Sequence, residues 1–268
     1  MLNILFIGDI VGKIGRKTIA KILPSLRKKI KVNLVIANVE NIAHGSGITP
    51  ETIQEVLNSG VDYCTSGDHT FRKRKQAEKC FEDKLPVIRP ANFPPSVPGK
   101  GYAIINYKKH RILLINLIGR VFMRMHYDCP FRKLDEILNN KNLAKEKFSA
   151  IIIDIHAETA SEKIALAYYA QGRVSAVFGT HTHVMTADHK IINKETAYIT
   201  DVGMVGFVNG SLGINKEEII KTFLEQINYA HQIPEKGEVI FNACLVKINP
   251  QNAKANLIQP LIKFDKIN

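Results

Sequence analysis

Residues 2–9 of the chain read LNILFIGD, a mostly apolar run that stops abruptly at a glycine and an aspartate. A short apolar run bounded by turn residues predicts a buried strand. Residues 16–30 then carry apolar side chains at helical spacing, although Pro24 is expected to kink or divide that helix. Residues 33–37 form a second run of the strand type. Strand, helix and strand in this order predict two parallel strands joined by a right-handed crossover.

A second crossover follows the first. Thr49 and Pro50 are typical of a helix start, with proline at the first helical position, and this helix is expected to end near Gly60. Residues 62–66 are a third strand candidate. The chain therefore opens as β-α-β-α-β, which favours a parallel sheet with helices packed against it.

The second half of the chain mixes antiparallel and parallel signals. Residues 102–107 and 111–118 flank three polar residues and predict a hairpin. Further strands are expected at residues 150–155, 174–178, 198–200, 238–248 and 255–262. The predicted fold class is α/β, with two mixed sheets packed together and covered by helices. We expect one domain over residues 1–268, because no linker or change in composition interrupts the chain.

Two more helices are expected from their first turns. Thr159-x-x-Glu162 and Asn215-x-x-Glu218 each match a capping box, in which two side chains satisfy free N–H groups of the first turn. The second of these helices carries apolar residues on one face: Ile219, Ile220, Phe223, Leu224 and Ile227.

Composition excludes several classes of protein. The chain has 268 residues, of which 45% are hydrophobic, so a large core can form and long disorder is excluded. No apolar run approaches the ~20 residues that a membrane span requires, so we expect no contact with a membrane. The four cysteines lie far apart and are expected to be reduced thiols. Asp9 interrupts the apolar N-terminus, so we expect no secretory signal and a cytoplasmic location.

The chain is strongly basic, with 37 Lys and Arg against 25 Asp and Glu, a formal charge of +12. Residues 28–31 and 72–75 are local basic clusters. No aromatic residues interleave with them, which favours a lysine-rich surface over a dedicated nucleic-acid face. Residues 72–75 fit either a solvated helix face or a surface that attracts a substrate phosphate, and the sequence leaves both open.

Polar residues able to bind a metal follow five of the predicted strands. They are Asp9, the pair Glu40 and Asn41, the pair Asp68 and His69, His156, and the pair His181 and His183. The carboxyl ends of strands in an open α/β sheet form the ligand crevice, so these groups are expected to converge on one rim. Each alone is more often a turn, cap or surface residue. Their coincidence is what indicates a metal site.

The types of ligand limit the metal and the reaction. Carboxylate, amide and imidazole groups without thiolate suit Mn, Fe or catalytic Zn, and argue against a structural zinc site. Eight candidate groups exceed the needs of one ion. Two ions about 3.5–4 Å apart, sharing one carboxylate, would use them and activate a water against a phosphoryl group. The pattern therefore predicts phosphoester hydrolysis.

Other motifs do not match. The glycines of residues 8–15 fit neither the P-loop nor the dinucleotide-binding pattern. Ser46 and Ser66 lack the G-x-S-x-G surroundings of a nucleophile elbow. The His181-x-His183 pair also occurs in metal-dependent amidohydrolase barrels, but the chain lacks eight regular β/α units, so a barrel is a minor alternative.

Five sequence blocks together resemble those of the calcineurin-like metallophosphoesterases, in particular the bacterial YmdB-type family. They are Gly8–Gly12, Asn38–Asn41, Gly67–Thr70, Asp154–Thr159 and Gly179–Val184, with Ala197–Met204 as a later block. The resemblance spans nearly the whole chain and implies a sandwich of two mixed sheets in α-β-β-α layers. It also implies hydrolysis of 2′,3′-cyclic nucleotides and related phosphodiesters at a di-iron or di-manganese centre, with zinc as a further option.

The resemblance also implies a role for each candidate residue. One metal would be bound by Asp9, Asn41 and His183, and the second by Asp68, His156 and His181. The carboxylate of Glu40 would bridge the two metals. His69 would be the acid that protonates the leaving alkoxide, a task that suits an imidazolium.

Asp68 departs from the family pattern, because members usually have Gly-Asn-His where this chain has Gly67-Asp68-His69. The added negative charge should tighten metal binding and weaken the Lewis acidity of the pair. We therefore expect an enzyme that is slower or shifted in its pH dependence. The other hypothesis is a regulator that binds metal or nucleotide without catalysis.

The expected substrate is a small phosphodiester or cyclic nucleotide, and RNA is a further expected partner. A phosphomonoesterase or a nuclease with the same site is the alternative. Self-association is left open, since apolar sheet edges favour it. His44 is a candidate for substrate contact, although the glycines at residues 45 and 47 fit a simple turn equally well. Asp201, at the end of a predicted strand, is a candidate for support of the ligands. The other histidines are expected at the surface: His110, His126, His189 and His231.

Overall fold

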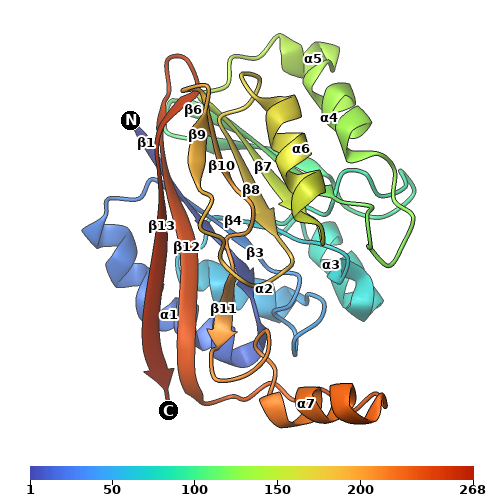
Figure 1. Ribbon diagram of the computed structural model, residues 1–268. Helices are drawn as coiled ribbons and strands as arrows, with labels where there is room; N and C mark the ends of the chain where they lie inside the picture. The colour runs from blue at the N-terminus through green and yellow to red at the C-terminus, as the bar shows by residue number, and fades with distance from the viewer.

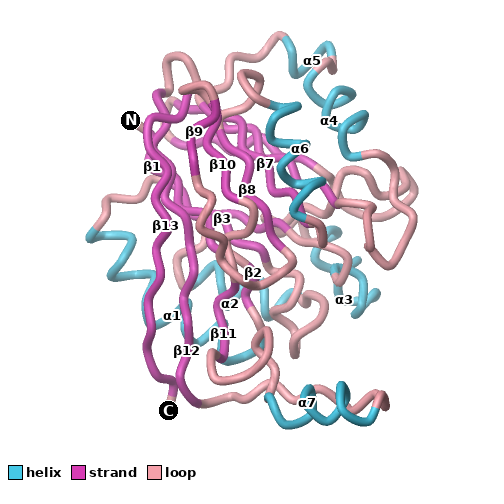
Figure 2. The backbone as a smooth tube through the Cα atoms, viewed as in Figure 1, coloured by secondary structure: helices cyan, strands magenta, loops and turns pink.

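The computed structural model describes residues 1–268. Two sheets pack face to face, and helices cover both outer surfaces (Figure 1). Figure 2 shows the strands of both sheets crossing the centre of the molecule with the helices outside them. The α/β fold of two mixed sheets flanked by helices is therefore confirmed.

The elements have the following bounds. The first sheet contains β1 (Leu2–Ile7), β2 (Asp9–Ile10), β3 (Leu34–Asn38), β4 (Tyr63–Thr65), β11 (Met204–Phe207), β12 (Gly237–Asn249) and β13 (Lys254–Ile267). The second contains β5 (Tyr102–Tyr107), β6 (His110–Ile118), β7 (Ala150–His156), β8 (Ala176–Thr180), β9 (Lys190–Ile192) and β10 (Thr196–Ile199). The helices are α1 (Gly12–Lys29), α2 (Pro50–Asn58), α3 (Arg74–Glu82), α4 (Pro130–Leu138), α5 (Lys141–Ala144), α6 (Ala160–Ala170) and α7 (Lys216–Glu225), and a 3-10 turn covers Thr70–Lys73.

Parallel strands form one edge of the first sheet and the middle of the second. The first sheet runs β2-β11-β12-β1-β3-β4, with β13 beside β12, and the second runs β5-β6-β7-β8-β10-β9. β1, β3 and β4 are parallel, as the opening of the chain predicts. β6, β7, β8 and β10 are also parallel, whereas β5 and β6 form the expected antiparallel hairpin.

β1 is buried on both faces, which explains its nearly continuous apolar sequence. Leu5 and Ile7 belong to the core between the first sheet and helices α1, α2 and α3. Ile4 and Phe6 point the other way, into the core between the two sheets. The Phe6 ring stacks on Phe178 of β8 with ring centroids 4.6 Å apart. A third core joins the second sheet to α4, α5 and α6, which completes four layers.

The structure corrects two predictions about α1. The helix begins at Gly12 rather than Arg16, and Pro24 lies inside it without dividing it. Proline removes one backbone hydrogen bond, but Leu23 and Leu26 on either side are buried against the sheet and offset that loss.

The predicted capping boxes of α6 and α7 are wrong. Neither Thr159 nor Asn215 caps its helix with its side chain. The carboxylate of Glu162 instead accepts hydrogen bonds from the backbone N–H groups of residues 120 and 121. The N–H of Asn215 donates to the carbonyl of Gln232, so it is not available to Glu218.

Helix α7 extends away from the body of the molecule at its lower end (Figure 1). None of its residues is buried, and Phe223 and Leu224 are each 79% exposed. None of the helices combines the length and the apolar character that are needed to span a membrane.

Candidate metal centre

The candidate ligands lie where parallel strands of both sheets end. Asp9 follows β1, Glu40 and Asn41 follow β3, Asp68 and His69 follow β4, His156 ends β7, and His181 and His183 follow β8. Within the second sheet, His156 pairs with Thr180, so the ends of β7 and β8 are level. The two sheets pack with these ends on one side, and all eight side chains meet there.

Four of these residues form a compact group around His156. Its Nε2 lies 3.3 Å from a carboxylate oxygen of Glu40 and 3.3 Å from one of Asp68. The same nitrogen lies 3.0 Å from Nδ1 of His181. One ligand atom from each of the four residues lies within 4.8 Å of all the others. This spacing is suited to a shared cation.

Asp9, Asn41 and His183 form a second group beside the first. Nε2 of His183 lies 3.8 Å from Oδ1 of Asp9 and 3.2 Å from the amide nitrogen of Asn41. That amide also donates to Oε1 of Glu40 at 3.1 Å, so Glu40 lies between the two groups. The amide oxygen of Asn41 faces His69 at 2.7 Å, and the amide must turn over for this oxygen to face His183.

Two of the candidate ligands have a buried carboxylate oxygen that accepts no hydrogen bond: Oδ1 of Asp9 and Oδ1 of Asp68. A buried anionic oxygen without a partner is costly unless a cation neutralises it. Burial raises the pKa of Asp9 to about 7, although His183 and His156 lower it. The residues therefore fit a pair of metal ions, and the donors are oxygen and imidazole nitrogen without any thiolate.

The electrostatics of the site favour positive charge at its centre. Burial would lower the pKa of His156, but Glu40, Asp68 and Asp9 together hold it well above its usual range. Burial and the neighbouring His156 lower the pKa of His181 to about 4. His181 is thus neutral near pH 7, the form in which imidazole binds a metal.

Gly67 leaves room for this cluster. A Cβ at this position would lie 2.3 Å from both Oε2 of Glu40 and Nε2 of His156. Such an approach is far inside van der Waals contact, so any side chain here would displace the candidate ligands.

His69 lies beside the cluster without being part of its compact group. Its Nδ1 is 2.7 Å from the amide oxygen of Asn41 and 3.3 Å from Glu40, and its Nε2 is 3.6 Å from Asp68. Its backbone N–H donates to Glu40 at 2.9 Å. The side chain is 29% exposed, so it reaches both the carboxylates and the solvent side of the rim.

Buried polar residues hold His156 in place. Asp154 accepts hydrogen bonds from Thr180 at 2.7 Å and from Asn38 at 3.0 Å, and burial raises its pKa. The Thr180 hydroxyl lies 2.9 Å from Nδ1 of His156, which fixes the ring so that Nε2 faces the carboxylates. Such support is typical of metal-binding histidines. Asp154 and Thr180 lie within two of the motifs, but no sequence pattern predicts their role in holding His156.

The segment that carries His181 and His183 has an unusual backbone. Both residues have positive φ, 99° and 65°, a conformation that is unfavourable for residues other than glycine. The buried carboxylate of Asp201 accepts two hydrogen bonds from Thr182, between the two histidines. Lys163 of α6 donates to the same oxygen at 2.8 Å, and both charged groups are fully buried. The supporting place that the sequence suggested for Asp201 agrees with these contacts.

Glu158 makes a contact with His181 that no sequence pattern predicts. Its carboxylate lies 3.0 Å from Nε2 of His181, on the opposite side of the ring from Nδ1. A carboxylate in this position selects the tautomer that leaves Nδ1 free to bind a metal.

A cavity of about 520 Å³ opens beside the cluster, and Glu40, His69 and His181 lie in its wall. His44 lines this cavity too. Four further lining residues come from segment 208–236: Leu212, Ile214, His231 and Ile233. No motif surrounds them in the sequence, so only the fold reveals that they reach the site. A larger cavity of about 680 Å³ between β4 and β5 contains none of the candidate ligands.

Comparison with known proteins agrees with this geometry. The family model for YmdB-like proteins matches residues 5–261. The chain is 42% identical over 265 residues to the 2′,3′-cyclic-nucleotide 2′-phosphodiesterase of Bacillus subtilis (strain 168), and the match covers 98% of each chain.

Solved structures support the same relationship. The crystal structure of a novel phosphatase from Mycoplasma pneumoniae has a TM-score of 0.91 at 31% identity and covers 100% of this chain and 94% of that one. A hypothetical protein from Thermus thermophilus has a TM-score of 0.90 at 35% identity and covers 98% and 100%. These matches confirm the resemblance that the sequence blocks suggest, and the chain belongs to the YmdB-like family.

Proposed function

We propose that the chain is a dinuclear metal-dependent phosphodiesterase that hydrolyses 2′,3′-cyclic nucleotides or related RNA-derived phosphodiesters. The observation that carries the proposal is the compact group around His156, in which one ligand atom from each of four carboxylate and imidazole side chains lies within 4.8 Å of the others. The B. subtilis relative, a 2′,3′-cyclic-nucleotide 2′-phosphodiesterase that is 42% identical over nearly the whole chain, supports the same substrate class.

The two groups of side chains would divide between two metal ions. One ion would be held by Asp9, Asn41 and His183, and the other by Asp68, His156 and His181. Glu40 would bridge them, because its carboxylate contacts both groups through His156 and Asn41. Iron or manganese suits this donor set best, with zinc as a further option.

The side chains around the ions perform the remaining steps. When bound, the ions supply Lewis acidity toward the phosphoryl oxygens and activate water for attack. His69 stands at the solvent side of Glu40 and Asn41, where it can give a proton to the leaving 2′ oxygen. The cavity lined by His44, Leu212 and Ile233 is suited to hold the nucleoside next to the reacting phosphate.

Asp68 makes this centre more negative than an asparagine would. Burial would raise the pKa of Asp68, but its contact with His156 and the charges of His156 and His69 lower it. Asp68 is therefore ionised, and we expect tight metal binding with slower turnover.

A cytoplasmic location fits four free, buried cysteines. Self-association is an additional proposal, which the exposed apolar residues of α7 support.

The experiment that tests the function is a substrate panel on the metal-loaded protein. Hydrolysis of bis(p-nitrophenyl) phosphate in the presence of Mn²⁺ or Fe²⁺ and its loss after chelation establish a metal-dependent phosphodiesterase. We then expect 2′,3′-cyclic AMP to be hydrolysed with the P–O2′ bond broken, and 3′,5′-cyclic AMP and 3′-AMP to be poor substrates.

Two results would overturn the proposal. Equal hydrolysis of 3′-AMP would favour a phosphomonoesterase. No hydrolysis of any compound by protein shown to contain two metal ions would favour a non-catalytic metal-binding regulator.

A further inference from the structure

The loop between β6 and α4 exposes apolar side chains beside the metal centre. Within residues 119–128, Phe122 is 86% exposed, Met125 59% and Val121 45%. Apolar side chains of this size rarely project into solvent together unless they contact something. Arg120 precedes these residues in the sequence, Arg124 lies between Phe122 and Met125, and both arginines are exposed as well.

Buried polar side chains hold both ends of this loop. The amide of Asn92 donates to the carbonyls of Ile118 and Asp128 at 2.7 and 2.8 Å and accepts from the N–H of Ile118 at 2.9 Å. Glu162 accepts from the N–H groups of Arg120 and Val121. Asn92 is fully buried and Glu162 is 8% exposed. The structure therefore fixes the base of the loop and presents its apolar tip.

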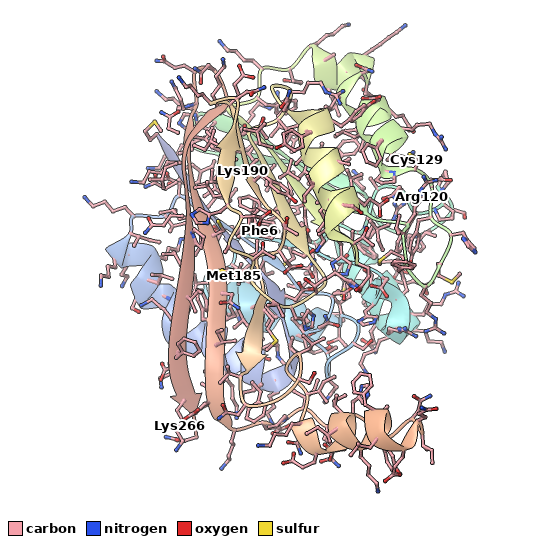
Figure 3. The ribbon with its side chains drawn as sticks, in the orientation of Figure 1. Phe6, Arg120, Cys129, Met185, Lys190 and Lys266 are labelled. Carbon is pink, nitrogen blue, oxygen red and sulfur yellow. The ribbon has the colours of Figure 1, made fainter.

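The loop lies next to both the metal centre and the basic residues that follow His69. The N–H of Gly119 donates to the carbonyl of His156 at 2.9 Å. Tyr127 stacks on Phe93 with ring centroids 5.0 Å apart, and Phe93 lies 6.1 Å from Phe71. Burial and the charges of Asp68 and Glu40 raise the pKa of Tyr127 to about 12, while Arg72 and Arg124 lower it. In Figure 3, Arg120 and Cys129 mark this loop on the side of the molecule where α3 lies.

Residues 72–75 and 120–125 together form a surface that we call the basic rim. Arg74 is paired with Glu78 at 2.8 Å. The other cations of the rim make no ion pair: Arg72, Lys73, Lys75, Arg120 and Arg124. Residues 72–75 and 120–125 lie far apart in the sequence, but Phe71, which precedes Arg72, is joined through the ring of Phe93 to Tyr127 of the 119–128 loop. Unpaired cations with exposed aromatic groups are suited to single-stranded nucleic acid.

We propose that the basic rim binds the RNA chain that precedes a terminal 2′,3′-cyclic phosphate. The inference rests on the proposed function. It extends the substrates from free cyclic nucleotides to RNA chains that end in a 2′,3′-cyclic phosphate. The terminal cyclic phosphate lies at the metal centre, the preceding backbone phosphates contact Arg120 and Arg124, and a base stacks on Phe122. Substitutions in the basic rim should therefore lower the hydrolysis of oligonucleotides and leave the hydrolysis of mononucleotides unchanged.

The test compares kcat/KM for 2′,3′-cyclic AMP with that for a ten-nucleotide RNA that ends in a 2′,3′-cyclic phosphate. The variants are Arg120→Gln with Arg124→Gln, and Phe122→Ala. We expect each to lower kcat/KM for the RNA about tenfold at low salt and to change that for cyclic AMP less than twofold. The matched controls are Lys108→Gln with Lys109→Gln, at the opposite end of β6, and Phe223→Ala on α7.

The inference is overturned if the rim variants leave kcat/KM for the RNA unchanged, or if the control variants lower it as much. If the wild-type protein hydrolyses neither substrate, the proposed function fails, and the inference is then decided by fluorescence anisotropy with a labelled RNA that ends in a 3′-phosphate. A third result would also contradict the inference: rim variants that bind RNA as well as the wild-type protein but no longer bind phosphatidylglycerol vesicles. That result would favour a membrane surface as the partner of the rim.

Discussion

The strand ends and segment 208–236 line the same cavity but are held in opposite ways. Glu40 is 1% exposed and Asp9 and His156 are fully buried, each fixed by neighbouring strands. Segment 208–236 contributes Leu212, which is 46% exposed, and its helix α7 has no buried residue at all. Burial on strands gives fixed ligand positions, whereas an exposed segment opens at low free energy. The candidate ligands thus lie on buried strand ends, whereas another part of the cavity wall comes from an exposed segment.

Replacing Glu40 with alanine should have the largest effect, because this residue contacts both groups of ligands. We expect kcat/KM to fall at least about a thousandfold, with most of the bound metal lost. Metal analysis and hydrolysis of bis(p-nitrophenyl) phosphate measure both effects. Glu217→Ala, an exposed carboxylate of α7 without an ion pair, is the matched control. Two retained metal ions in the Glu40→Ala protein would contradict the bridging role.

His69→Ala should lower kcat for 2′,3′-cyclic AMP by about 10²–10⁴ while both metals stay bound. An acid matters less when the leaving group is already weakly basic, so the loss should be much smaller for bis(p-nitrophenyl) phosphate. His189→Ala, outside the candidate site, serves as the control. An equal loss for both substrates would argue that His69 positions the ligands instead of giving a proton.

Lys163→Met tests how the strained segment 181–183 is held. Removing one partner of a buried ion pair should lower the free energy of unfolding by about 3–5 kcal/mol, because Asp201 stays buried without its cation. We expect metal affinity to fall about 10–100-fold as Thr182 loses its fixed partner. Urea unfolding and calorimetric titration with Mn²⁺ measure the two quantities.

The double variant Lys163→Met with Asp201→Asn separates stability from positioning. It should regain most of the stability, since no unpaired charge is left, but not the full metal affinity. Recovery of both together would mean that the pair only stabilises the fold.

The smallest effect is expected for substitutions in the exposed helix α7. Phe223→Ala with Leu224→Ala should change the free energy of unfolding by no more than about 0.5 kcal/mol, because neither side chain packs against the rest of the chain. Urea unfolding at two protein concentrations checks this. A larger loss of stability that depends on protein concentration would instead place α7 in an interface between copies of the chain.

The sequence predicts most of the candidate metal ligands but few of the residues that line the cavity beside them. Asp9, Glu40 and His156 are recognisable because each polar residue interrupts or follows a long apolar run, and strand direction then determines where they meet. Short elements escape this reasoning: β2 has two residues and β9 three, too few for any periodicity to appear.

The rest of the site depends on contacts between distant segments. His231 and Ile233 reach the cavity through the path of segment 208–236, which no local pattern specifies. Glu162 fits a capping box in sequence, but the fold uses its carboxylate to anchor residues 120 and 121. A local signal cannot show which of two partners a side chain will take.

Gly67 restricts how this centre can change over evolution. No atom can be added at this position without entering the space shared by Glu40 and His156. The ligand sphere therefore cannot shrink or gain a donor from that direction, and its properties can shift only by exchanging one donor atom for another at an existing position. An exchange between asparagine and aspartate at residue 68 would be of this kind, because the two side chains have the same shape and differ in charge.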